Sequence, residues 1–116
     1  MQYINRLIQG HKHGGITMNI KIHSIRFDAD KKLLHFINAK IRKLMQYYDD
    51  IIGAEVFLRL DRSQDLENKV VEIRLLLPGN ELFAKKQSKT FEESTDLSVE
   101  ALRRQIMKHK TKLRRA

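Results

Sequence analysis

The sequence predicts an α+β protein whose elements follow the order strand, helix, strand, strand, strand, helix (βαβββα). Two segments show the 3.6-residue apolar spacing of a helix, and four shorter segments alternate apolar and polar residues as strands do. Because each strand alternates, one face of the four-stranded sheet is expected to be covered by both helices. The other face is expected to meet water or a partner. The chain of 116 residues has room for one such domain.

The folded domain is expected at 18–116, with Met18 as the natural start and the first strand at 19–25. Residues 1–17 include the polar stretch His11-Lys12-His13-Gly14-Gly15 and differ in character from the strand that follows. They are therefore predicted to be a flexible N-terminal extension. Two histidines without a third ligand do not predict a metal site.

The first helix is predicted to begin after Asp30, because aspartate side chains cap helix N-termini well. Its apolar stripe is expected to consist of Leu33, Ile37, Ile41, Leu44 and Tyr48. The helix is expected to end near Tyr48, and Gly53 is expected to supply a turn before the next strand.

Three consecutive strands are predicted at 54–61, 70–77 and 81–87, each with alternating apolar residues. A polar loop at 63–68 joins the first two, and the short turn at 78–80 predicts a hairpin between the last two. The second helix is predicted to begin after Thr90 as its N-cap. Its buried stripe is expected to consist of Phe91, Thr95, Val99, Leu102, Ile106 and Leu113.

Positive charge is concentrated in this last helix. The chain has a formal net charge of +9, and no acidic residue follows Glu100. Uncompensated charge of one sign destabilises a compact chain, so the pattern indicates a polyanionic partner bound through its phosphates. One flank of the helix is predicted to carry Arg104, Lys108, Lys112 and Arg115, and the other to carry Arg103, Lys110 and Arg114.

The first helix is predicted to carry cations on a similar flank, at Lys32, Lys40 and Lys43, so two adjacent helices would form one positive surface. Cations at helical spacing suit a phosphate backbone and read no base sequence, which favours shape-led recognition of folded RNA. For Lys31, Lys32 and Arg42, a solvated side chain without function is an equally good interpretation. Aromatic candidates for base stacking, which could equally belong to the core, are Tyr47, Phe57 and Phe83.

The sequence does not support several other classes of protein. The chain has no cysteine, which excludes disulfides, zinc knuckles and thiol chemistry. It has no apolar run of about 18 residues and no secretory leader, which predicts a cytoplasmic protein without a membrane partner. It has no nucleophile motif, phosphate loop or dinucleotide fingerprint, so we expect no enzyme activity, cofactor or small-molecule substrate.

Residues 38–51, NAKIRKLMQYYDDI, and residues 95–113, TDLSVEALRRQIMKHKTKL, form a recognisable pair of segments. They resemble the first and last helices of the ribosome hibernation-promoting factors, also called ribosome-associated translation inhibitors. The most specific part is the pattern Leu-x-Arg-Gln-x-x-Lys-x-Lys-x-Lys, which begins at Leu102. The resemblance extends from Met18 to the end of the chain and leaves residues 1–17 outside.

The resemblance implies a double-stranded-RNA-binding-like fold, with two helices packed on one face of a four-stranded sheet. It also implies a translation inhibitor that binds the small ribosomal subunit, through rRNA and ribosomal proteins, in the messenger and transfer RNA channel. Such an inhibitor promotes ribosome hibernation in stationary phase or stress. The chain resembles the short form of the family, so a separate ribosome-dimerising factor is a further candidate partner. The RNA-binding candidates are Lys40, Lys43, Lys86, Lys89, Arg103, Arg104, Lys108, Lys110, Lys112, Arg114 and Arg115.

Two other interpretations stay open at this point. One is a general RNA- or DNA-binding module that acts away from the ribosome, which sedimentation with the small subunit would separate from a ribosome factor. The other is an enzyme of small phosphorylated substrates that uses the cations as an anion site. This enzyme would lack any candidate nucleophile or base.

Overall fold

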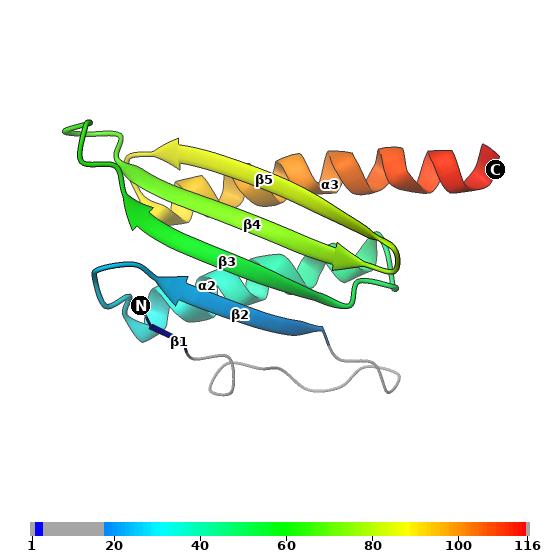
Figure 1. Ribbon diagram of the computed structural model, residues 1–116, viewed down its shortest axis with the longest axis horizontal. Helices are drawn as coiled ribbons and strands as arrows, with labels where there is room; N and C mark the ends of the chain where they lie inside the picture. The colour runs from blue at the N-terminus through cyan, green and yellow to red at the C-terminus, as the bar shows by residue number, and fades with distance from the viewer. Residues whose placement is uncertain (1, 4–17, 116) are drawn as a thin grey trace.

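The computed structural model describes the backbone of residues 2–3 and 18–115 and the side chains of residues 18–113. It confirms the predicted order of elements (Figure 1). They are β1 (Gln2–Tyr3), β2 (Asn19–Ser24), α2 (Lys31–Arg42), the 3₁₀ helix η1 (Lys43–Gln46), β3 (Gly53–Leu60), β4 (Lys69–Leu77), β5 (Asn80–Ser88) and α3 (Phe91–Arg115).

The sheet has the order β1-β2-β3-β4-β5. The strands β2 and β3 are parallel and joined through α2, whereas β3, β4 and β5 form antiparallel pairs. The predicted four strands are therefore confirmed as the body of the sheet. The two-residue strand β1, which was not predicted, pairs with the outer edge of β2. The rest of the predicted N-terminal extension lies outside the described residues.

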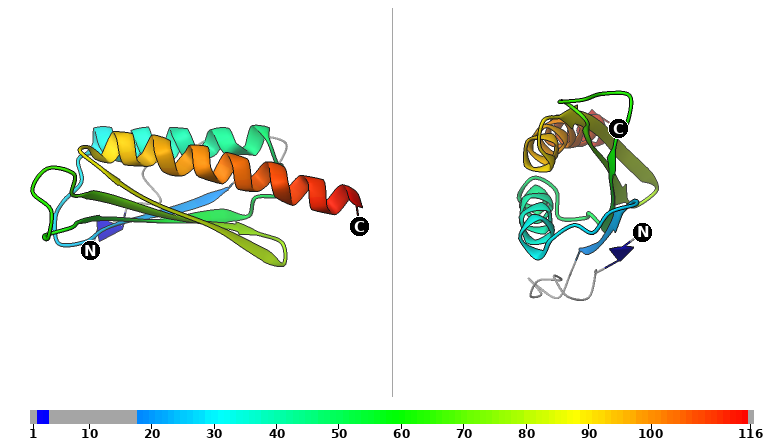
Figure 2. Two further views of the ribbon diagram at one scale, coloured as in Figure 1. Left: turned by 90° about the horizontal axis from the view of Figure 1, so that it is seen from above. Right: turned by 90° about the vertical axis from the view of Figure 1, so that its left-hand side faces the viewer.

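Both helices cover the same face of the sheet, and the opposite face is open (Figure 2). The alternation in the strands points their apolar residues toward the helices, as the sequence predicted. The apolar residues buried between the two layers include Ile20, Ile22, Val56, Leu58, Ile73 and Leu75 from the strands and Leu34, Ile37, Ile41, Leu102 and Ile106 from the helices. This single core fixes both helices on the sheet.

The start of α2 follows its prediction, but its end does not. The Asp30 carboxylate accepts a hydrogen bond of 2.8 Å from the Leu33 backbone N–H, which caps the helix. The α-helix ends at Arg42, earlier than predicted, and tightens into the 3₁₀ turn of η1. Gly53 is the first residue of β3 and not part of a turn. A Cβ at this position would lie 2.7 Å from the Asn19 carbonyl oxygen, so the parallel pairing of β2 and β3 requires glycine here.

The helix α3 begins as predicted, because the Thr90 hydroxyl accepts a 3.0 Å hydrogen bond from the Glu93 backbone N–H. Its buried face contains Leu102 and Ile106, which are fully buried. Leu113 was predicted to belong to this face but is 53% exposed. The reason is visible in Figure 1, where the last turns of α3 extend beyond the β4–β5 hairpin and have no sheet to cover them.

The packing of α3 can be tested with two adjacent residues. The substitution Ile106→Ala should lower the free energy of unfolding by about 2–5 kcal/mol, because Ile106 is fully buried and the change leaves a cavity. The control Met107→Ala, at a residue that is 43% exposed, should change it by less than about 0.5 kcal/mol. Urea unfolding measures both, and equal effects of the two substitutions would contradict the placement of this helix.

Candidate nucleic-acid interface

The helices α2 and α3 lie side by side and run in the same direction. One ion pair joins the two helices, and two ring contacts join α3 to the turn that follows η1. The Lys40 ammonium lies 3.1 Å from the Asp96 carboxylate, and the Arg103 guanidinium lies 6.0 Å from the centre of the Tyr47 ring. Farther along, Tyr48 makes an edge contact with His109 at 5.3 Å between ring centres. Side chains of both helices therefore contribute to one surface.

The charge of α3 changes sign along its length. Its first half carries acidic residues, and every charged residue from Arg103 onward is a cation. This order is favourable for the helix itself, since acids stabilise the positive N-terminal end of the helix dipole and cations stabilise the negative C-terminal end. The acidic residues of the first half are Glu92, Glu93, Asp96 and Glu100. The separation leaves the second half without acids on its own helix.

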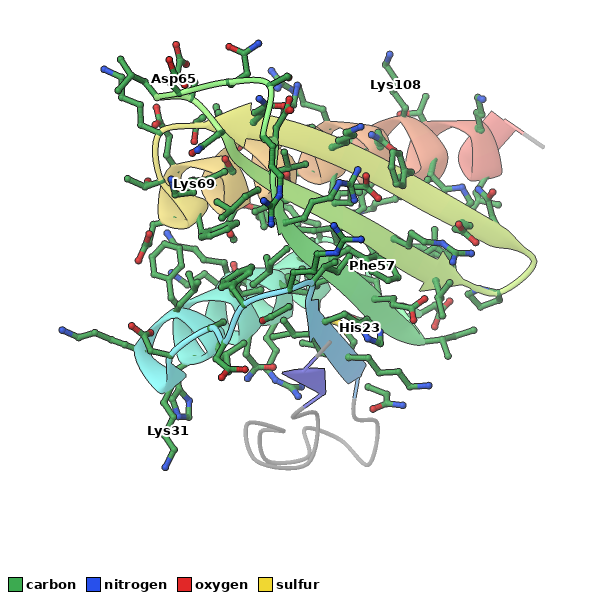
Figure 3. The ribbon with its side chains drawn as sticks, turned by 60° about the vertical axis from the view of Figure 1, so that its left-hand side comes forward. His23, Lys31, Phe57, Asp65, Lys69 and Lys108 are labelled. Carbon is green, nitrogen blue, oxygen red and sulfur yellow. The ribbon has the colours of Figure 1, made fainter. Side chains whose placement is uncertain are left out.

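A row of exposed cations follows one flank of this second half. Arg104, Lys108 and Lys112 are exposed and recur every four residues, so they project from neighbouring turns of the same flank. Figure 3 shows Lys108 pointing outward from the helix. None of the three has an ion-pair partner within the part of the chain that the structure describes. We call Arg104, Lys108 and Lys112 the cationic row.

Two other candidates are partly compensated by carboxylates. Lys40 is paired with Asp96 across the helices, and Arg103 donates to Glu100 through Nε and Nη2, at 3.1 and 2.6 Å. The hydrogen bond from Arg103 lowers the pKa of the Glu100 carboxyl and raises the pKa of the arginine. Both pairs are largely solvated, so each contributes little to stability. Their cations are therefore less available to a polyanion than the cationic row.

The remaining candidates fall into three places. Lys110 borders a surface depression of about 400 Å³ that is also lined by Asp49, Asp50 and two tyrosines. Lys43 is exposed on η1, at the end of α2. Lys86 and Lys89 are exposed at the end of β5, next to the acidic start of α3, so the structure does not bring them together with the cationic row. The side chains of Arg114 and Arg115 lie outside the described residues.

The open face of the sheet has a different electrostatic character, because most of its charges are paired. Arg74 donates to Glu81 at 2.8 and 2.9 Å and approaches Glu55 at 3.5 Å. Glu72 pairs with both Arg59 and Lys85 on the neighbouring strands. These cross-strand pairs offset positive with negative charge on this face. The second half of α3 differs from this face, because Arg104, Lys108 and Lys112 have no carboxylate partner among the described side chains.

The aromatic candidates for base stacking are divided between the two faces. Phe57 stacks on His23 on the open face, with ring centres 4.8 Å apart, as Figure 3 shows. Phe83 is exposed on the same face, whereas Tyr47 is half-buried beneath Arg103. The structure therefore does not gather these rings beside the cationic row.

Sequence reasoning assigned no role to Gln105, although this residue lies inside the Leu-x-Arg-Gln pattern. Its amide nitrogen donates to the Phe83 carbonyl at 2.8 Å, and the Phe83 backbone N–H donates back to its amide oxygen at 3.3 Å. This pair satisfies backbone groups on the free edge of β5 that another strand would otherwise use. Gln105 therefore attaches the second half of α3 to the sheet, one residue after the cationic row begins.

Two features are absent from the part of the chain that the structure describes. No helix in this part of the chain is both long enough and apolar enough to span a bilayer. No group of three or more histidine, cysteine, aspartate or glutamate side chains in it is arranged to hold a metal ion.

The fold defines a class of small α+β domains in which two parallel helices cover one face of a mixed sheet. Comparison with known proteins assigns the family: the chain belongs to the family described as Sigma 54 modulation protein / S30EA ribosomal protein, which matches residues 20–114. This result confirms the family predicted from residues 38–51 and 95–113.

Relatives and solved structures agree with the assignment. The chain is 32% identical over 98 residues to the ribosome hibernation promotion factor of Bacillus subtilis, and it spans about half of that protein, 51%. It is 27% identical over 97 residues to the ribosome hibernation promoting factor of Escherichia coli and spans 98% of it. Each alignment covers 84% of this chain.

The fold is shared with two solved structures, each aligned over 79% of this chain and 97% of the other. One is a ribosomal subunit interface protein from Coxiella burnetii, with a TM-score of 0.71 and 22% identity. The other is the Protein Y N-terminal domain of Thermus thermophilus, with a TM-score of 0.68 and 18% identity.

The pairing of Arg103 with Glu100 predicts a measurable titration. The pKa of the Glu100 carboxyl should lie below its ordinary value and should rise toward it in Arg103→Gln, because the hydrogen bond from the guanidinium is lost. Carbon-13 NMR of the glutamate carboxyls measures this. The control Arg104→Gln should cause a smaller rise, since Arg104 acts on Glu100 only through its charge. An unchanged titration in Arg103→Gln would contradict the observed pair.

The pair of Arg103 and Glu100 also makes the stability of the fold depend on pH. Because the pKa of Glu100 is lowered in the folded chain, the stabilisation is present above the ordinary carboxyl pKa. It is lost as the pH falls through the lower folded value.

Proposed function

We propose that this protein is a translation inhibitor that binds the small ribosomal subunit and promotes ribosome hibernation in stationary phase or stress. The observation that carries the proposal is the cationic row, a set of unpaired cations on the family's fold. The names of the relatives supply the ribosome as the partner. The protein would act without catalysis, as a ribosome-associated protein of the cytoplasm.

The binding surface is proposed to be the second half of α3, together with Lys43 and the partly compensated Lys40 and Arg103. The cationic row extends over eight residue steps, which correspond to about 12 Å along the helix. A rigid row of this length can contact several phosphates of folded RNA at once. Such contacts fix position and orientation without reading base sequence. The ribosome offers this kind of target, because its rRNA is folded into rigid shapes.

Inhibition is proposed to be steric. In the channel that messenger and transfer RNA occupy, a folded domain of this size would exclude them while its cations replace the counterions of the rRNA. The rigidity of the domain supports this proposal, since α3 is held to the sheet by its apolar core residues and by Gln105. Release would need no chemical step and would follow loss of the electrostatic attraction.

A general RNA- or DNA-binding module acting away from the ribosome is the second candidate function. It is favoured by the same cationic row, because phosphate contacts alone do not select the ribosome. Sucrose-gradient sedimentation of a stationary-phase lysate separates the two functions. A ribosome factor travels with the small subunit, whereas a general module remains with other nucleic acid or at the top of the gradient.

Reversing charges in the cationic row tests where the RNA binds. The double substitution Lys108→Glu and Lys112→Glu should abolish sedimentation with purified small subunits, because attractive contacts with phosphate become repulsive. The melting temperature should stay nearly unchanged, since both side chains are exposed.

The matched control is Lys31→Glu with Lys32→Glu, which makes the same change in net charge on exposed residues of the first turn of α2. This control should retain most of the binding. Equal loss in both double variants would mean that net charge alone, and not this surface, governs binding.

The salt dependence of binding tests the electrostatic mechanism separately. If about seven phosphates are neutralised, the logarithm of the association constant should fall with the logarithm of salt concentration, with a slope of about −5 to −6. Fluorescence anisotropy of labelled protein with small subunits, measured over a series of salt concentrations, gives this slope. A slope near zero would rule out phosphate contacts as the source of affinity.

A further inference from the structure

A second basic feature lies at the other end of the molecule. Arg26, Arg59 and Arg62 border a surface depression of about 240 Å³, together with Ile25 and Leu60. The depression lies where β2 and β3 end, and Figure 1 places these strand ends at the end of the molecule where α3 begins. The cationic row lies toward the opposite end of α3. The lining of this depression therefore forms a separate group of cations that none of the RNA-binding candidates includes.

Two of the three arginines of this depression are unpaired and available for a ligand. Arg26 and Arg62 are exposed and have no ion-pair or hydrogen-bond partner among the described residues. Arg59 contacts Glu72 through Nη2, so its charge is partly compensated. The acid nearest in sequence, Asp61, does not line the depression, because its carboxylate accepts hydrogen bonds from Ser63 and Gln87. No carboxylate belongs to the lining.

The backbone at Arg26 adds an independent observation. Its φ is +65°, in the left-handed region that favours glycine. Among the described residues, Arg26 is alone among non-glycine residues in having a positive φ. A non-glycine side chain in this region strains the backbone, and such residues gather at functional sites. An arginine at a position where glycine would be less strained is consistent with a role for its guanidinium.

The geometry points to a phosphate-binding site formed by Arg26, Arg59 and Arg62. Guanidinium groups bind phosphate oxygens with pairs of parallel hydrogen bonds, which makes arginine well suited to this ligand. The volume of about 240 Å³ is below the usual range for whole small-molecule ligands but has room for a phosphate group. That group could be supplied by free inorganic phosphate or by one phosphodiester of an RNA strand. The site does not rest on the function proposed above.

Titration by nitrogen-15 NMR tests the site with two probes, inorganic phosphate and a short single-stranded RNA. The backbone amide signals of Ile25, Arg26, Leu60 and Arg62 should shift on addition of phosphate if the site accepts free anions. If RNA alone shifts them, the ligand is a phosphate of a nucleic-acid strand, and the site stands. If neither probe shifts these signals, the site is rejected.

The substitution Arg26→Gly separates binding from folding. Binding of whichever probe shifts the signals, inorganic phosphate or RNA, should weaken about tenfold. The reason is that a charge-assisted hydrogen-bonding group is lost. The melting temperature should stay the same or rise, because glycine accepts the positive φ without strain. The control Lys31→Gln removes one cation from an exposed residue outside the depression and should leave binding unchanged. Equal binding by Arg26→Gly and the original chain would overturn the proposal.

Failure of this site and failure of the proposed function are distinguishable. In the double variant Lys108→Glu and Lys112→Glu, the amide signals of Ile25 and Arg26 should still shift on addition of inorganic phosphate. If only RNA shifts them in the original chain, RNA should still shift them in the variant. It should lose sedimentation with small subunits. If the charge reversal abolished both the amide shifts and the sedimentation, the two basic regions would form a single binding surface. The proposal of a separate site would then be rejected.

Discussion

The packing of α3 against the sheet determines which side chains the molecule presents. Leu102 and Ile106 lie in the core, and the hydroxyl of the buried Ser94 donates to the Lys69 carbonyl of β4 at 2.7 Å. A rotation of α3 by one residue, about 100°, would break these contacts and move charged side chains toward the core. The buried face of α3 therefore determines how the helix is oriented on the sheet. The direction in which the cationic row points is a consequence of that orientation.

The fixed orientation of α3 also gives the molecule two surfaces of different charge, the open face of the sheet and the second half of α3. The open face of the sheet pairs its charges across neighbouring strands, as in Arg74 with Glu81 and Lys85 with Glu72. The second half of α3 has no acid of its own and extends past the hairpin. Although the whole chain is basic, with a net charge of +9, its surplus is thus unevenly distributed. An uneven distribution gives a polyanion a preferred orientation on the protein, which a uniform charge would not.

Most elements of the fold could be predicted from the sequence, because apolar spacing and cap residues are local signals. Asp30 and Thr90 cap their helices as predicted. The features that sequence reasoning missed depend on contacts between distant segments. They include the close approach at Gly53, the partner of Lys40 on α3, and the depression that joins Arg26 to Arg62. The exposure of Leu113 was missed for a related reason, since periodicity does not reveal where the neighbouring sheet ends. For the candidate site, the sequence located the cations but not their carboxylate partners.

The most direct measurement is a structure of this protein bound to the small ribosomal subunit, determined by electron cryomicroscopy. We expect the second half of α3 to lie against the rRNA backbone, with Arg104, Lys108 and Lys112 within hydrogen-bonding distance of phosphate oxygens. The paired charges of the sheet should face away from that contact. A complex in which the open face of the sheet meets the rRNA, with the second half of α3 exposed to solvent, would contradict the central claim.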